Sequence, residues 1–186
     1  MGEHTAGQVA DLAGARRQID VWRSAKQRIV LTNGHFDLLH LGHVDYLQRA
    51  AALGDALVVG VNSDASTRAL KGPHRPLVPD QERAAVLAAL ACVDLVVIFD
   101  ELTADQLVRE LAPDIYVKGG DWDPTGDAAQ LAVSDRPTGE PPEARVVRTY
   151  GGDVRYLPYL AGHSTSALIA TIVSRYAARA ASLETD

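Results

Sequence analysis

Two histidines at the start of a predicted helix give the strongest chemical signal in this sequence. The apolar run 29–31 ends in Thr-Asn-Gly at 32–34, and a new apolar period begins only after Gly42. This pattern indicates a strand, a tight loop and a helix. His40 and His43 are three residues apart, so they share one face of the first helical turn. Free N–H groups and the positive end of the helix dipole favour an anion there, which predicts a phosphate pocket with two imidazole donors.

The glycines fit this interpretation. A side chain at Gly34 or Gly42 would keep a phosphate from the backbone or from the helix start. A histidine near a helix end is more often a cap or a surface residue. The density of unusual residues directly after a buried strand favours function instead: Asn33, Gly34, His35, Phe36, Asp37, His40, Gly42 and His43.

The same residues carry a family resemblance. Gly34-x-Phe36-Asp37-x-x-His40-x-Gly42-His43 resembles the signature of nucleotidyltransferases with a His-x-Gly-His motif, which join a nucleoside triphosphate to a phosphorylated or acidic substrate and release pyrophosphate. The longer string 32–40 most resembles the adenylyltransferase domain of ADP-heptose synthase. The resemblance implies transfer of AMP from ATP to a sugar 1-phosphate, above all D-glycero-β-D-manno-heptose 1-phosphate. It also implies Mg²⁺ bound mainly through the phosphates of ATP, with no protein metal ligands.

Site roles follow from the resemblance and from positions after predicted strands. The catalytic candidates are His40, His43, Lys71 and Lys118. The nucleotide-binding candidates are Asn33, Gly34, His35, Phe36, Gly42, Arg83, Gly120, Ser164, Thr165 and Ser166. The substrate-binding candidates are Asp37, Asp64, Arg75, Asp121 and Trp122.

Some of these roles keep a structural alternative. The loop 70–76 is either a solvated connector or, as the resemblance implies, a segment that closes over phosphates with Lys71 and Arg75. Arg83 either pairs with a surface carboxylate or faces nucleotide phosphates. Ser164 or Thr165 caps the last helix, and Gly-x-Ser-Thr at a helix start is also a second anion cradle.

Composition limits the class of protein. A chain of 186 residues suits one α/β domain. It has no apolar run near twenty residues and no secretion signal, and its one cysteine, Cys92, cannot form an internal disulfide, so a cytoplasmic location is expected. A net charge of −6 disfavours nucleic acid, although a few local Lys, Arg and His residues could still hold small phosphates. The resemblance implies ATP and a sugar phosphate as these partners.

The order of predicted elements gives the fold class. Runs apolar on both faces alternate with helical periods, which predicts a Rossmann-like three-layer α/β/α sandwich with a mostly parallel five-stranded sheet. We expect strands at 29–31, 56–61, 93–99, 114–117 and 154–157, and a helix over 79–90 that buries Val86, Leu87 and Leu90. The expected organisation is an N-terminal helical segment (1–27), a nucleotidyltransferase domain (28–178) with a long Pro-rich loop (123–145), and a tail (179–186).

Alternatives to the adenylyltransferase remain. A cytidylyltransferase acting on glycerol 3-phosphate or another polyol phosphate would carry Arg-Thr-Glu where this chain has Tyr-Leu-Ala at 159–161, and would lack Lys118 and Gly119, so ATP is favoured over CTP. A non-catalytic nucleotide-binding regulatory module would keep the cradle without turnover. A fragment of an aminoacyl-tRNA synthetase is disfavoured by the acidic charge. The resemblance implies a homodimer, and the short segment before the first strand implies a separate heptose kinase acting upstream.

Overall fold

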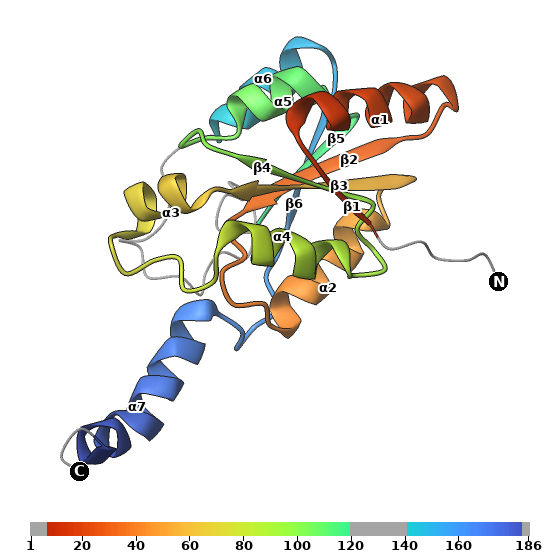
Figure 1. Cartoon of the computed structure of the whole chain (residues 1–186). Coiled ribbons are helices and arrows are strands. Elements are labelled where there is room, and N and C mark those ends of the chain that lie inside the picture. The colour runs from red at the N-terminus through yellow and green to blue at the C-terminus, as the bar shows by residue number, and fades with distance from the viewer. Residues whose placement is uncertain (1–6, 120–140, 184–186) are drawn as a thin grey trace.

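One parallel sheet organises the molecule. The computed structural model describes residues 7–119 and 141–183. In these residues six strands pair in the order β1-β4-β3-β2-β5-β6, and every pairing is parallel (Figure 1). The strands are β1 (Gln8–Ala10), β2 (Ile29–Gly34), β3 (Ala56–Asn62), β4 (Leu95–Phe99), β5 (Ile115–Gly119) and β6 (Asp153–Leu157). The helices are α1 (Leu12–Ser24), α2 (Leu41–Ala51), α3 (Asp64–Lys71), α4 (Asp80–Ala88), α5 (Asp105–Leu111), α6 (Pro142–Thr149) and α7 (Thr165–Leu183).

Two hydrophobic cores lie on the two faces of the sheet. Ile29 and Leu31 of β2 join a core with α1, α5 and α6, whereas Val30 between them joins a core with α2 and α4. Side chains of a strand alternate between faces, so a strand that is apolar throughout needs a helix layer on each side. The predicted three-layer α/β/α sandwich is confirmed (Figure 1).

The N-terminal segment differs from the prediction. Residues Gln8–Ala10 form an edge strand beside β4, so the described sheet has six strands and not five. Ala15 and Ile19 of α1 are fully covered in the core. The segment 1–27 was predicted as helical and separate, but its described part is a strand and a helix of the sandwich. Three residues are too few to show a strand period.

Other boundaries also shift. Helix α6 begins at Pro142, inside the segment predicted as a loop over 123–145, while 123–140 lie outside the described residues. Helix α7 continues to Leu183, past the predicted start of the tail at 179. In α4, Val86 is 51% exposed and not buried, because Arg83 and Ala84 turn toward the interior in its place.

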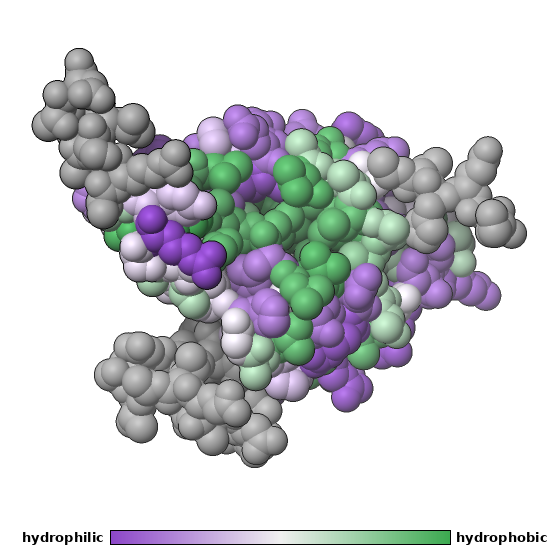
Figure 2. All heavy atoms as spheres, turned by 90° about the horizontal axis from the view of Figure 1, so that it is seen from below, coloured by the Kyte–Doolittle hydropathy of each residue, from purple (hydrophilic) through white to green (hydrophobic). Residues whose placement is uncertain are grey.

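The described helices differ in how much apolar surface they expose. No described helix is long and apolar enough to cross a membrane. Helix α7 extends away from the sandwich (Figure 1), and Ile172, Val173 and Tyr176 on it are exposed. The outer face of the α2 and α4 layer carries a hydrophobic patch among polar regions (Figure 2).

The connections define where a ligand can enter. From β2 the chain moves through β3 to β4 on one side, and then returns to place β5 and β6 on the other side of β2. The carboxyl ends of β2 and β5 therefore flank the point where strand order reverses, which is where open α/β sheets bind ligands.

Candidate functional site

The paired histidines lie at the start of α2. His40 has an extended backbone and precedes the first helical residue, and its side chain makes no cap bond. Its ring stacks on that of His43, with 3.9 Å between centroids. The Nδ1 atoms of both rings are buried without a hydrogen-bond partner in the described residues. Two imidazoles with unused ring nitrogens thus stand beside the N–H groups of a helix start, an arrangement that suits phosphate oxygens.

Burial keeps these rings uncharged at neutral pH. It lowers the pKa of His43 to about 4, with the nearby His40 as the second cause. Burial also lowers the pKa of His40, and His163 adds to this effect. A neutral imidazole carries one N–H donor and one lone pair. Each ring can therefore donate one hydrogen bond to an oxygen while it stays uncharged.

Gly34 has a local structural role. Phe36 adopts a positive φ of 47°, which folds its ring back against β2. A Cβ at Gly34 would lie 3.0 Å from this ring. The ring of Phe36 in turn lies 5.4 Å from that of His43, centroid to centroid. Gly34 thus makes room for the side chain that supports His43, and its predicted contact with nucleotide stays a prediction.

The second helix start is a neighbour of the first. The Oγ of Ser164 accepts the N–H of Ala167 at 3.1 Å and so caps α7. A Cβ at Gly42 would lie 2.9 Å from the Cβ of His163, the residue before this cap. The ring centroids of His163 and His40 are 6.3 Å apart. His163, the residue before the start of α7, therefore lies beside the imidazole pair, while the predicted nucleotide contacts of Ser164, Thr165 and Ser166 stay predictions.

His163 was not nominated from the sequence. Its Nδ1 lies 3.0 Å from the carbonyl oxygen of Ala161. A carbonyl only accepts, so Nδ1 donates, and Nε2 is the ring nitrogen that is left for other contacts. Its place next to Ser164 in the predicted anion cradle was the available signal.

A polar cluster joins β5 to β2 at the reversal point. The Nζ of Lys118 lies 3.2 Å from the Oδ1 of Asn33, 3.1 Å from the hydroxyl of Tyr116 and 3.2 Å from the Oε1 of Glu143. Burial, and then the charge of Glu143, raises the pKa of Tyr116 well above its usual value, so this group stays a neutral phenol. Tyr116 and Glu143 were not nominated from the sequence, because their partners are distant along the chain.

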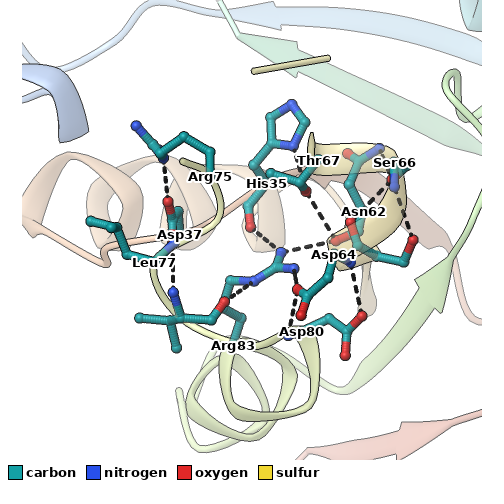
Figure 3. A network of polar contacts seen from close by, with 12 residues as sticks. His35, Asp37, Asn62, Asp64, Ser66, Thr67, Arg75, Leu77, Asp80 and Arg83 are labelled. Carbon is teal, nitrogen blue, oxygen red and sulfur yellow. Dashed lines mark hydrogen bonds and ion pairs between the residues drawn. The ribbon is translucent and has the colours of Figure 1, made fainter. Parts of the chain in front are cut away.

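A second network holds the loop between α3 and α4 (Figure 3). Asp37 is 4% exposed, and its carboxylate pairs with Arg75 and accepts the N–H groups of Leu77 and Val78. This carboxylate therefore fixes the backbone of the loop that follows Lys71. In the structure Asp37 and Arg75 pair with each other. Their predicted contacts with substrate stay predictions.

Arg83 is the centre of this network. Its side chain is 1% exposed, and it donates to the carbonyl oxygens of Val78, His35 and Asn62 and to the Oδ1 of Asp64 (Figure 3). These contacts use four of its five N–H groups. Arg83 pairs with a carboxylate, but its own side chain is buried and not at the surface as predicted, and its predicted contact with nucleotide phosphates stays a prediction. Arg83 thus ties the ends of β2 and β3 to α4.

His35 lies beside this network. Its Nδ1 is 3.0 Å from the Oγ1 of Thr67. Burial lowers its pKa to about 4, and the cations Lys71, Arg83 and Arg75 add to the effect. These cations are partly offset, because Asp37 raises this pKa and pairs with Arg75, while Asp64 pairs with Arg83.

The remaining predicted residues are placed as follows. Lys71 is exposed at the last turn of α3. Gly120, Asp121 and Trp122 lie outside the described residues. In the described ranges 7–119 and 141–183, no group of three or more His, Cys, Asp or Glu side chains is arranged to hold a metal ion.

Comparison with known proteins agrees with this geometry. Residues 31–170 match the sequence profile of the family described as Cytidylyltransferase-like. The chain belongs to this family. This family match confirms the nucleotidyltransferase resemblance and the Rossmann-like fold that were predicted from the motifs.

Two similar cytidylyltransferase-like relatives are long proteins. The chain is 48% identical over 161 residues to Bifunctional protein HldE of Syntrophotalea carbinolica, covering 87% of this chain and 30% of that protein. It is 45% identical over 168 residues to Bifunctional protein HldE of Geobacter metallireducens, covering 90% and 31%. The chain thus spans about 30% of the length of these relatives.

A solved structure shares the fold. The crystal structure of the lipopolysaccharide core biosynthesis protein from Thermoplasma volcanium GSS1 superposes with a TM-score of 0.51 at 29% identity. The match covers 72% of this chain and 97% of that one.

Proposed function

We propose that this chain is an adenylyltransferase that transfers AMP from ATP to D-glycero-β-D-manno-heptose 1-phosphate, giving ADP-heptose and pyrophosphate. The observation that carries the proposal is the juxtaposition of two helix starts, one with His40 and His43 and one with Ser164. The similarity to Bifunctional protein HldE supports the heptose acceptor.

The chemistry needs alignment and charge, not a protein nucleophile. A phosphate oxygen of the acceptor attacks the α-phosphorus, a new P–O bond forms, and the bond to the departing pyrophosphate breaks in line with it. His40 and His43 donate to oxygens on which charge builds, and the start of α7 holds the outer phosphates. Lys71 and Lys118 add positive charge at the two sides of the pocket.

Mg²⁺ belongs to the proposal as a companion of the nucleotide. Mg²⁺ keeps several waters and is commonly bound through substrate phosphates with few protein carboxylates. The lack of a metal-holding group in the described residues is compatible with an ion held mainly by ATP. The ion would neutralise charge on the pyrophosphate as it leaves.

The assembly and setting are further parts of the proposal. The exposed apolar side chains of α7 and the hydrophobic patch over α2 and α4 support a homodimer (Figure 2). A cytoplasmic location and an upstream heptose kinase stay predictions from the sequence. Sedimentation tests the homodimer, cell fractionation tests the location, and loss of heptose 1-phosphate on deletion of a kinase gene tests the upstream kinase.

The activity is tested by a substrate panel. ATP, CTP and GTP are each mixed with heptose 1-phosphate, other sugar 1-phosphates and glycerol 3-phosphate in the presence of Mg²⁺, and pyrophosphate is measured. We expect ATP with heptose 1-phosphate to be the best pair. The variant His43→Asn should lower its turnover by about 10²–10³-fold, the usual cost of one lost transition-state donor.

Two outcomes would favour the alternatives. Preference for CTP with glycerol 3-phosphate would favour the cytidylyltransferase. Tight ATP binding with no pyrophosphate from any pair would favour a nucleotide-binding regulatory module.

A further inference from the structure

A buried carboxylate faces the ammonium group of Lys118. The Oε1 of Glu143, in the first turn of α6, lies 3.2 Å from the Nζ of Lys118. The two side chains are 4% and 13% exposed. Charged groups this well buried persist only when they are paired, because each would otherwise lose its hydration without compensation. The two residues therefore form a buried ion pair at the carboxyl end of β5.

The surroundings of Lys118 match the geometry of its head group. An ammonium has three N–H donors. Asn33 Oδ1, the Tyr116 hydroxyl and Glu143 Oε1 all lie within hydrogen-bond distance of Nζ. Asn33 and Tyr116 are neutral, so Glu143 supplies the countercharge in this set. Without it, Lys118 loses the one carboxylate of this set.

Glu143 is itself fixed by other elements. Its Oε1 also accepts the N–H of Ala104 at 3.2 Å, and Ala104 precedes α5 at a helix start that no side chain of its own segment caps. Val146 and Val147 anchor α6 in the core beside α5. The carboxylate is thus held by packing on one side and by a backbone N–H on another, so it can impose a position on Lys118.

Lys118 is the cation that pairs with the carboxylate of Glu143. Its Oε2 is buried and has no hydrogen-bond partner in the described residues. A buried carboxylate with one unsatisfied oxygen is costly, and a nearby ammonium is the group that offsets this cost. The two side chains therefore depend on each other, and not only on the packing around them.

We propose that Glu143 is a positioning residue for the transfer reaction, which fixes the ammonium of Lys118 where β2 and β5 meet and the triphosphate is held. This inference rests on the proposed function of the site. In this proposal Glu143 acts on the reaction through Lys118. Its removal should therefore matter for catalysis only while Lys118 is present.

A double-mutant cycle tests this dependence. Glu143→Gln keeps the shape and an oxygen for Ala104 while it removes the charge. We expect it to lower kcat with ATP and heptose 1-phosphate on the order of 10- to 100-fold, since about 1 Å of misplacement can cost 10²-fold. In a Lys118→Met background the same substitution should change kcat by less than about twofold, because coupled residues are not additive.

The matched control is Glu110→Gln. Glu110 lies on α5 and pairs with Arg16, whose side chain is 60% exposed. This variant should leave kcat unchanged. Should Glu143→Gln not fold, Glu143→Asp, which keeps the charge and shortens the reach, takes its place in the cycle.

The outcomes separate the two proposals. Equal losses in both backgrounds, or an unchanged kcat in the single variant, would overturn the role of Glu143 while leaving the adenylyltransferase intact. If the wild-type protein binds ATP but transfers nothing, the proposed function fails. The same cycle measured as ATP affinity by calorimetry then decides the role of Glu143: non-additive losses support it, and additive losses reject it.

Discussion

At the scale of single residues, burial sets the chemistry of the histidines. His35 and His43 both have a pKa of about 4 in the folded protein, with loss of hydration as the main cause. An arriving anion favours the protonated form of a nearby imidazole. The imidazole of His43 is therefore uncharged at neutral pH, and a bound phosphate would raise its pKa and favour its protonated form.

These pKa values make stability depend on pH. Unfolded histidines titrate near pH 6.5, so between about pH 6.5 and 4 the unfolded chain binds more protons than the folded one. Stability is present above about pH 6.5 and is lost as the pH falls toward 4. The free energy of unfolding, measured in urea at about pH 7.5 and about pH 5, should decrease less in His43→Asn than in the wild type. An equal decrease in both proteins would show that His43 is not buried as described, and exposed His74→Asn is the control.

Residue types at the site were predictable, but their partners were not. The spacing of His40 and His43 and the resemblance around them were visible in the sequence. The approach of His163 and the pairing of Glu143 with Lys118 depend on residues far apart in the chain. Local patterns cannot show such contacts, because only the folded sheet brings the segments together.

At the scale of elements, the site depends on the close approach of two helix starts. Gly42 permits this approach, because a Cβ there would lie 2.9 Å from His163 and 3.1 Å from the ring of His40. The sequence suggested that Gly42 leaves space for a phosphate. In the structure two histidine side chains lie against the Cβ position of Gly42, and its predicted contact with nucleotide stays a prediction.

The substitution Gly42→Ala tests the approach. It should move His163 away from His40 and lower ATP affinity at least about tenfold, while the alanine favours the helix by up to about 1 kcal/mol. Calorimetry with Mg-ATP measures the affinity. Gly14→Ala in the first turn of α1 adds a Cβ at a helix start that carries none of the candidate residues, and should leave affinity unchanged. Unaltered affinity in Gly42→Ala would mean that the two helix starts do not share a ligand.

Elements with a clear apolar run were predictable, including the short strands β5 and β6, whereas some other elements were not. The alternation around β2, α2 and β3 gave their order and the helix layers on both faces. Strand β1 has three residues and is specified by its pairing with β4, which no local period reveals. Helix α6 starts with prolines, so its first turn had the composition of a loop.

At the scale of the whole molecule, Arg83 joins four segments of the chain through side-chain hydrogen bonds. Its four acceptors come from the end of β2, the end of β3, the start of α3 and the loop before α4. The substitution Arg83→Met removes these four hydrogen bonds and should lower the free energy of unfolding by about 3–5 kcal/mol, the cost of breaking a buried pair. Urea unfolding measures this change.

A surface arginine provides the comparison. Arg16→Met removes an exposed pair with Glu110 and should cost no more than about 1 kcal/mol. Similar losses in the two variants would show that Arg83 is not the link described. A large loss in Arg83→Met with ATP affinity unchanged in the folded fraction would place its role in stability alone.

The account depends on one triphosphate that spans the two helix starts at the reversal point of the sheet. A crystal structure with Mg²⁺ and an ATP analogue that cannot be cleaved between the α- and β-phosphates tests this most directly. We expect the α-phosphate at hydrogen-bond distance from His40 and His43, and the γ-phosphate at the start of α7 beside Ser164 and Thr165. A triphosphate bound elsewhere, or in contact with one helix start alone, would contradict the account.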